Sequence, residues 1–182
     1  KILEKNKTDL EILERDIKAL ENTVKPFHKI THTEAVKMLQ DMGSDIKDGE
    51  DLGADDETML TKKFDNPIFV THYPAKIKSF YMERNVNNHE LAECSDLLAP
   101  EGYGEIIGGS QREDDHDTLL QRLKEEKLSQ EDFQWYLDLR KYGSVPHGGF
   151  GFGLERIVAW VCGIQHVRET IPFPRTINRL KP

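Results

Sequence analysis

Cysteine and long apolar runs are both scarce in this chain of 182 residues. Its two cysteines, Cys94 and Cys162, form no CxxC pair, which excludes a structural zinc framework and favours a reducing compartment. We expect both to be buried thiols. No window approaches the ~18 consecutive apolar residues of a membrane helix, and the lysine-rich start lacks the apolar stretch of a signal peptide. The sequence therefore predicts a soluble, cytoplasmic protein with no membrane partner.

Positive charge is in deficit as well. Lys and Arg number 25 against 33 Asp and Glu, for a net charge of −8, which argues against a protein that grips nucleic acid over most of its surface. Residues 44–58 hold seven acidic residues and one lysine, and their spacing matches no EF-hand loop. We predict a solvated acidic loop there. The rest of the chain is nearly neutral, which permits a nucleic-acid partner bound away from this loop.

Apolar spacing predicts helices in the first part of the chain. Residues 1–25 show one narrow apolar stripe between charges, and Pro26 ends it. We interpret this segment as an amphipathic helix docked on its own domain, with a coiled-coil seam as the alternative. Thr31 and Glu34 form a capping box for a second helix, residues 33–41.

The middle of the chain reads as a sheet. Strand-forming residues between turn formers occupy 67–73, 77–82, 92–98 and a run from 103 toward 109. Short links between them predict an antiparallel arrangement. Helices are expected at 117–126, at 130–141 with Ser129 as its cap, and at 154–162. The predicted fold is therefore α+β, an antiparallel sheet flanked by helices.

A glycine-rich stretch gives the strongest local signal. In an extended strand, side-chain alternation would place Gly149, Gly151 and Gly153 on one bare face. The same alternation would bury Phe150 and Phe152 on the other face.

A bare strand face lets a flat ring lie against the peptide planes, and Arg156, in the first turn of the next helix, could stack on that ring. This pattern predicts a nucleobase clamp. The alternative, of similar weight, is tight helix packing with Arg156 in an ordinary salt bridge. The phosphate-loop and dinucleotide-binding motifs are excluded by the glycine spacing and the lack of Gly-Lys-Ser/Thr. His147 has no obvious nucleophile beside it, so we expect it to pack or to orient a neighbour.

Two acidic residues sit on neighbouring predicted strands. The loop 100–102 would bring Asp96 and Glu105 close together at the ends of the sheet. Paired carboxylates of this kind suit Mg²⁺, which fills its octahedron with phosphate oxygens and water. The alternative is plain surface charge.

Arg112 lies seven residues after Glu105, roughly 23 Å away along an extended strand. We expect Gly108 and Gly109 to bend the strand and bring Arg112 into the cleft of the acids. An arginine guanidinium placed there can donate hydrogen bonds to a carboxylate or an amide oxygen of a ligand. The alternative is an ion pair with neighbouring Asp114 or Asp115.

Taken together, these residues resemble the C-terminal part of the catalytic domain of asparaginyl-tRNA synthetases, class II enzymes of the aspartate-like subgroup. The similarity rests on four segments: 104–113 resembles the family's metal and amino-acid segment, 140–148 the stretch before the third class signature, 149–156 that signature, and 171–175 the terminal tail. Within this resemblance, residues 1–25 correspond to a linking helix and 147–163 to the adenine-binding strand and helix. The implied fold is an incomplete class II catalytic domain.

The resemblance implies specific roles. Arg156 would stack on the adenine of ATP beside the three alternating glycines, Gly149, Gly151 and Gly153. Glu105 and Asp96 would hold Mg²⁺ on the phosphates, and Arg112 would read the β-carboxamide oxygen of asparagine. Arg156 and Glu105 are then the candidate catalytic residues. The implied reaction is attack of the asparagine carboxylate on the α-phosphate of ATP, followed by transfer to tRNA.

The sequence departs from the family in two respects. The interval from Asp96 to Glu105 is longer than usual, which makes the metal role of Asp96 less secure than that of Glu105. No segment matches the first class signature, which builds the dimer interface, or the second, which clamps the α-phosphate. We therefore expect a homodimer only of the full-length protein, and no adenylate formation by residues 1–182 alone.

Alternative functions remain open at this point. An aspartyl-tRNA synthetase, or an asparagine synthetase derived from one, would keep Arg112, Glu105 and Arg156. A non-catalytic nucleotide-binding regulatory module would keep only the adenine strand.

Overall fold

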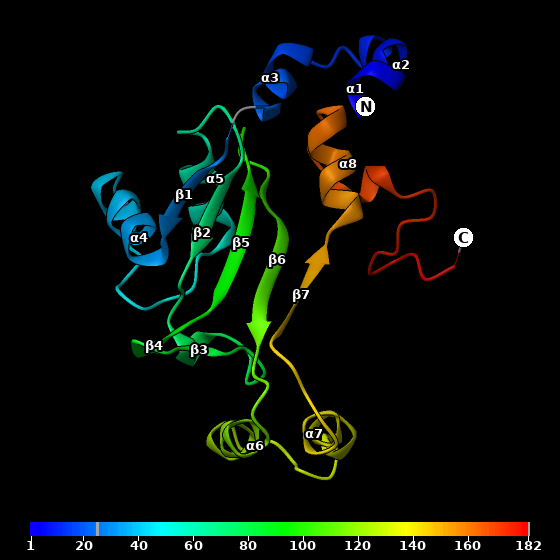
Figure 1. The fold of residues 1–182 in the computed structure, drawn as a ribbon. Coiled ribbons are helices and arrows are strands. Elements are labelled where there is room, and N and C mark those ends of the chain that lie inside the picture. Colours follow the sequence, from blue (N-terminus) through cyan, green and yellow to red (C-terminus); the bar gives the residue numbers. More distant parts are fainter. Residues whose placement is uncertain (25, 182) are drawn as a thin grey trace.

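Five strands form the main sheet of the computed structural model, which describes residues 1–24 and 26–181 (Figure 1). Their order is β1-β2-β5-β6-β7, with bounds His28–Thr31, Ile68–Thr71, Cys94–Ala99, Gly104–Arg112 and His147–Phe152. The β1–β2 pair is parallel and the other three pairs are antiparallel. β3 (Arg84–Asn85) and β4 (Asn88–Ala92) form a separate two-stranded sheet. The predicted α+β architecture is confirmed, with one parallel edge strand in addition.

Helices cover both faces of this sheet and lie at both of its ends (Figure 1). The α-helices are α1 (Ile2–Lys5), α2 (Lys7–Ile12), α3 (Ile17–Glu21), α4 (His32–Asp41), α5 (Ala54–Thr61), α6 (His116–Glu125), α7 (Gln134–Lys141) and α8 (Leu154–Cys162). Short 3-10 turns are η1 (Asn22–Val24), η2 (Ala75–Ile77) and η3 (Val167–Thr170). In Figure 1, α1 to α3 lie near α8 at one end, and α6 and α7 lie at the other.

The prediction of one continuous helix over residues 1–25 is wrong, and residue 25 lies outside the described residues. Glu14 adopts a left-handed backbone with φ 54°, which no helix interior accommodates. The Asp16 side chain then accepts a hydrogen bond from the backbone N–H of Lys18 at 3.0 Å and starts α3. Docking on the same domain is confirmed, because Leu10 and Leu20 are buried against Trp160 of α8.

The acidic segment is only partly a loop. Residues 54–58 belong to α5, so the loop predicted for 44–58 ends earlier than expected. The Asp56 carboxylate accepts a hydrogen bond from the Gly53 N–H at 3.2 Å, and acidic residues in the first turn favour a helix N-terminus electrostatically. The capping box of Thr31 and Glu34 at the start of α4 is confirmed.

Two other boundaries differ from prediction. Residue 77 ends η2 and residues 78–82 are irregular instead of a strand, and Phe80 in this segment is buried against the helices α6 and α7. Within the described residues the backbone of this segment pairs with the sheet only at an isolated bridge between Met82 and Arg112. α7 begins at Gln134 instead of residue 130, since Ser129 caps only a turn by accepting from the Asp132 N–H.

The main apolar core lies between α4, α5 and the face of β2 and β5 that they cover. Cys94 belongs to this core, whereas Cys162 is only half-buried, and both are free thiols. The prediction of two buried thiols therefore holds for Cys94 alone. No helix within residues 1–24 and 26–181 is long and apolar enough to cross a membrane.

Leu98 tests this core directly. Its side chain has no exposed surface, so Leu98→Ala should lower the free energy of unfolding by about 2–5 kcal/mol through lost burial and a residual cavity. Urea denaturation measures the change. Leu139→Ala on the exposed side of α7, where Leu139 is 56% accessible, should change stability little. Equal effects of the two variants would contradict this description of the core.

Candidate active site

One face of the sheet carries the chemistry-bearing residues. Asp96 of β5 pairs with Gly108 of β6, which pairs with Gly151 of β7, and paired residues project to the same face. Ser110 and Gly149 form the next pair on that face, with Arg112 at its end. The opposite face of β5 and β6 packs against α2, α3 and α8, so the two faces are chemically distinct.

A β-bulge brings Glu105 onto this face. The pairing shifts between Leu97 and Leu98, which face Ile107 and Glu105, so residue 106 has no partner on β5. Without this extra residue, side-chain alternation would place Glu105 on the opposite face of the sheet. The bulge therefore places the Glu105 side chain on the same face as Asp96.

The two acidic residues then converge as predicted. A Cβ added to Gly108 would lie 2.5 Å from Glu105 Oε1 and 3.2 Å from Asp96 Oδ1. Burial and the neighbouring Asp96 raise the pKa of the Glu105 carboxyl, partly offset by Arg156. Two carboxylates that converge in this way could hold a cation.

These carboxylates fit the magnesium ion that the resemblance implies. Within the described part of the chain, no group of three or more His, Cys, Asp or Glu side chains could hold a metal ion. Mg²⁺ needs only one or two carboxylates when phosphate oxygens and water complete its octahedron. A metal carried in together with a nucleotide therefore matches this donor set.

Lys78 is a site residue that the sequence did not reveal. Its Nζ lies 3.1 Å from Asp96 Oδ2, 3.6 Å from Asp51 Oδ1 and 3.7 Å from the centre of the Tyr73 ring. Burial alone would lower the pKa of Lys78, but Asp96 and Asp51 raise it above its usual value. Lys78 therefore stays charged, fixes one oxygen of Asp96 and leaves the other facing Glu105.

Glu57 is a second residue that sequence reasoning missed, because it fell inside the predicted solvated loop. Its Oε2 accepts a hydrogen bond from the Glu105 backbone N–H at 2.9 Å. Burial raises the pKa of the Glu57 carboxyl, and this hydrogen bond opposes the shift. Glu57 thus anchors the start of β6, from which Glu105 projects.

Arg156 stands at the other side of the acids, as the motif predicted. Gly153 precedes α8, and a Cβ there would lie 3.3 Å from Arg156 Cδ, so the glycine lets the arginine lie close to the strand. Arg156 Nη1 donates to the Glu105 carbonyl at 2.7 Å. It is exposed and forms no ion pair with a described residue, which disfavours the salt-bridge alternative.

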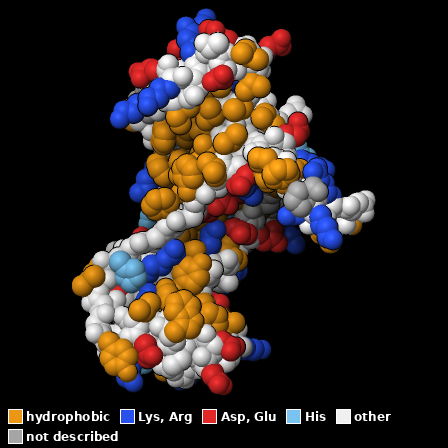
Figure 2. Space-filling model, turned by 90° about the vertical axis from the view of Figure 1, so that its right-hand side faces the viewer, with side chains coloured by type: hydrophobic (Ala, Val, Ile, Leu, Met, Phe, Trp, Pro, Cys, Tyr) orange, Lys and Arg blue, Asp and Glu red, His pale blue; other side chains and the backbone are white. Residues whose placement is uncertain are grey.

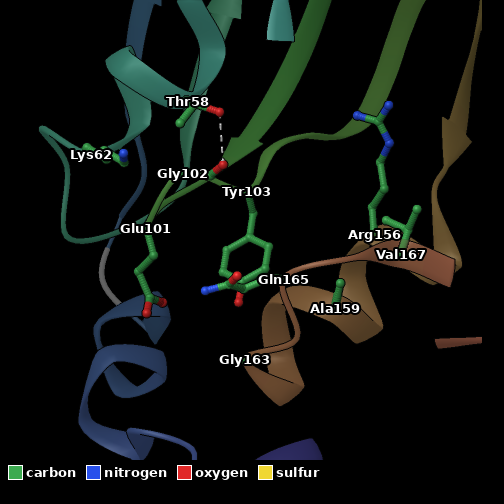
Figure 3. Close-up of a pocket in the computed structure, with 10 residues that line it drawn as sticks. All are labelled: Thr58, Lys62, Glu101, Gly102, Tyr103, Arg156, Ala159, Gly163, Gln165 and Val167. Carbon is green, nitrogen blue, oxygen red and sulfur yellow. Dashed lines mark hydrogen bonds between the residues drawn. The ribbon is translucent and has the colours of Figure 1, made fainter. Parts of the chain in front are cut away.

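A cavity of about 350 Å³ opens between Arg156 and Glu105 and includes Gly108, Gly151 and Gly153. A second cavity, of about 440 Å³, lies on the other side of Arg156 (Figure 3). Tyr103, Gln165 and Arg156 line this second cavity, and the Arg156 side chain extends from α8 away from the Tyr103 ring (Figure 3). Arg156 therefore forms a wall shared by both cavities.

The expected burial of Phe150 and Phe152 is wrong for this chain. The two side chains are 72% and 54% exposed, because β7 is an edge strand and no described element covers their face. A groove of about 780 Å³ lies next to Phe150 and is lined by Phe69, Leu97 and Ile107 among others. Figure 2 shows the side of the molecule on which β7 lies, and hydrophobic side chains are gathered on that side.

Arg112 reaches the shared face without a bend at Gly108 and Gly109. The prediction that Gly108 and Gly109 bend β6 is wrong, because the pairing with β7 continues unbroken from Ile107 to Arg112. Arg112 therefore lies at the far end of the same face as Glu105. Its guanidinium packs over the Tyr81 ring, 4.8 Å from the centroid, and Nη1 donates to Ser110 Oγ. In the described chain it forms no ion pair with Asp114 or Asp115.

Arg140 and His147 fix the chain beside Arg112. Arg140 is buried, donates from Nε to the Glu113 carbonyl at 3.0 Å and packs over the Tyr136 ring at 4.0 Å. His147 donates from Nδ1 to the Val145 carbonyl at 2.8 Å, and its Nε2 accepts from Arg140 at 3.4 Å. The predicted orienting role of His147 fits these contacts.

The family model for tRNA synthetases class II (D, K and N) matches residues 2–177. The chain belongs to this family. It is 52% identical over its whole length to the asparagine–tRNA ligase of Koribacter versatilis (strain Ellin345) and covers 42% of that protein. A class II synthetase fold is therefore established for this chain, as its sheet and flanking helices indicated.

Solved class II synthetases agree with this placement. Asparaginyl-tRNA synthetase from Pyrococcus horikoshii, crystallised with asparaginyl-adenylate, shares 53% identity and a TM-score of 0.95 over 99% of this chain and 42% of its own. Aspartyl-tRNA synthetase from Entamoeba histolytica shares 31% identity and a TM-score of 0.81 over 87% of this chain and 33% of its own. The chain thus spans less than half the length of these relatives.

Proposed function

We propose that this chain is the part of an asparagine–tRNA ligase that binds ATP and asparagine for adenylate formation. The observation that carries the proposal is the single sheet face on which Arg156, the Asp96–Glu105 pair and Arg112 follow one another. The 52% identity to an asparagine–tRNA ligase, and the 53% identity to a synthetase solved with asparaginyl-adenylate, support asparagine as the amino acid.

The residues have separate tasks in this proposal. Arg156 stacks on one side of the adenine while the backbone at Gly151 supports the other. Glu105 and Asp96 would hold Mg²⁺, which when bound neutralises charge on the phosphates of ATP. Arg112 donates to the side-chain oxygen of the amino acid. In-line attack of a carboxylate on the α-phosphate depends mainly on positioning and charge neutralisation, which these residues provide without a covalent intermediate.

Arg112 alone does not separate asparagine from aspartate. A guanidinium has only donors, and both a carboxamide oxygen and a carboxylate accept from it. Aspartate-specific ligation and ammonia-dependent asparagine synthesis would therefore use the same arginine. Activity with asparagine compared with activity with aspartate therefore tests the proposal most directly.

We propose further that residues 1–182 act within a longer polypeptide and do not form the adenylate alone. The chain covers 42% of its curated relative, and β7 presents an unpaired edge next to exposed Phe150 and Phe152. A homodimeric, cytoplasmic enzyme that works on tRNA follows from the same proposal.

The deciding experiment is amino-acid-dependent exchange of pyrophosphate into ATP by the full-length protein that contains this chain. Exchange is expected with asparagine and at least ~10²-fold less with aspartate, because a site built for an amide leaves polar groups unpaired with the acid. Residues 1–182 alone should give no exchange above background.

Preference for aspartate would replace asparagine as the proposed substrate. Nucleotide binding without exchange for either amino acid would favour a regulatory module. Turnover by residues 1–182 alone would contradict the need for further segments.

A further inference from the structure

The three alternating glycines of β7 are not equivalent. A Cβ on Gly151 would meet no described atom closer than the Gly108 carbonyl at 4.0 Å, so this position is open for a ligand. A Cβ on Gly153 would lie 3.3 Å from Arg156 Cδ. A Cβ on Gly149 would lie 2.8 Å from Arg112 Nη2, 3.1 Å from Nε and 3.3 Å from Cζ. Gly149 is therefore covered by Arg112, at the end of the face away from Arg156.

The guanidinium of Arg112 lies close to two neighbouring surfaces. Three of its atoms lie against the bare backbone at Gly149, and the Tyr81 ring packs beside it with 4.8 Å between Cζ and the centroid. Nη1 donates to Ser110 Oγ, the only hydrogen bond of this guanidinium to any of the described residues. The remaining N–H groups of the guanidinium are therefore free to donate hydrogen bonds to an oxygen atom of a ligand.

From this arrangement we propose that Gly149 is a positioning residue for amino-acid recognition and not part of the adenine support. The absence of a side chain lets the Arg112 guanidinium lie close against β7 and next to the Tyr81 ring, where its free donors meet the carboxamide oxygen. This proposal rests on the proposed function, because it takes Arg112 as the reader of the amino-acid side chain. It reassigns one glycine that the class signature groups with ATP binding.

The conformation of Gly149 makes the proposal testable with a small change. Its φ lies outside the left-handed region, so alanine can adopt the same backbone without strain. The atoms that a methyl group would displace belong to the flexible end of an arginine side chain, and the fold should survive. The expected consequence of Gly149→Ala is therefore a shifted guanidinium within an intact sheet.

The experiment compares Gly149→Ala with Gly151→Ala in pyrophosphate exchange by the full-length protein. Gly149→Ala should raise the KM for asparagine by about 10- to 100-fold, the loss expected for misplaced charge-assisted hydrogen bonds, with the KM for ATP nearly unchanged. Gly151→Ala should show the reverse pattern. A raised KM for ATP with an unchanged KM for asparagine in Gly149→Ala would overturn the proposal, as would an equal rise of both.

Tyr81 gives an independent check. Tyr81→Phe keeps the aromatic face and should keep the KM for asparagine close to that of the unaltered protein, whereas Tyr81→Leu removes the ring and should raise that KM alone. Equal behaviour of the two variants would contradict the role of the ring. If the unaltered protein uses aspartate, the proposed function fails, and the same comparison made with aspartate still decides the role of Gly149.

Discussion

Arg156→Ala is expected to lower asparagine-dependent pyrophosphate exchange by about 10²- to 10³-fold, a loss typical of removing one preorganised charged group from an active site. Arg156 lies over Gly153, is exposed toward the ligand side and forms a wall of the cavity that contains Glu105 and Gly151. Its removal takes away both the stacking plane and a positive charge next to the paired acids. The KM for ATP should rise together with the fall in kcat.

Two further variants separate stacking from charge. Arg156→Lys keeps the positive charge but loses the planar fork, so it should recover only a small part of the activity. Arg168→Ala removes an exposed arginine of η3 whose guanidinium, among the described residues, hydrogen-bonds to His166, and it should leave exchange unchanged. Near-complete activity of Arg156→Lys would show that charge alone is needed and would contradict a stacking role.

Glu105→Gln is expected to lower activity strongly and to stabilise the fold. Glu105 and Asp96 converge over Gly108, and burial raises the pKa of Glu105 because its ionised form is disfavoured in the folded chain. The neutral amide of Gln removes the charge repulsion between Glu105 and Asp96, and it also removes a carboxylate that would bind a cation. Exchange should fall by about 10²-fold or more, and the midpoint of urea denaturation at pH 7 should rise, the usual opposition between stability and function at such sites.

The pH dependence of stability has a definite sign. The pKa of Glu105 is higher in the folded chain than in the unfolded chain, so protonation of this carboxyl favours the folded state. The free energy of unfolding of the protein therefore increases as the pH falls through the folded-state pKa of Glu105. The Glu105→Gln variant should lose this increase.

Denaturation curves at several pH values measure the dependence. The exposed Glu169→Gln serves as the matched control and should keep the increase. A Glu105→Gln protein of lower stability at pH 7, or one with full activity, would contradict the assignment of this carboxylate.

Local sequence was sufficient for the parts of the site built from neighbouring residues. The placement of Arg156 after a glycine strand depends on alternation and on one helix start, and both are local properties. The proximity of Asp96 and Glu105 followed from two consecutive strands. Its detailed cause, a bulge at residue 106, was not predicted, since a bulge is fixed by pairing with β5 and not by the residues of β6 alone.

Residues supplied from a distance escaped prediction. Lys78 lies on a segment expected to be a strand, and only the folded chain places its Nζ between Asp51 and Asp96. Glu57 lies in a run of acidic residues, for which charge predicts exposure. Its carboxylate nevertheless accepts a hydrogen bond from the Glu105 backbone N–H at the start of β6. The pattern of Phe150 and Phe152 indicated a buried face, but burial depends on a partner surface that the described residues do not supply.

A crystal structure of the full-length protein with asparagine and a non-hydrolysable ATP analogue tests these residue roles most directly. We expect adenine between Arg156 and the backbone at Gly151, phosphates next to Glu105 and Asp96, and the carboxamide oxygen of asparagine on Arg112, whose guanidinium still covers Gly149. Adenine bound over Gly149, or asparagine bound away from Arg112, would contradict these roles.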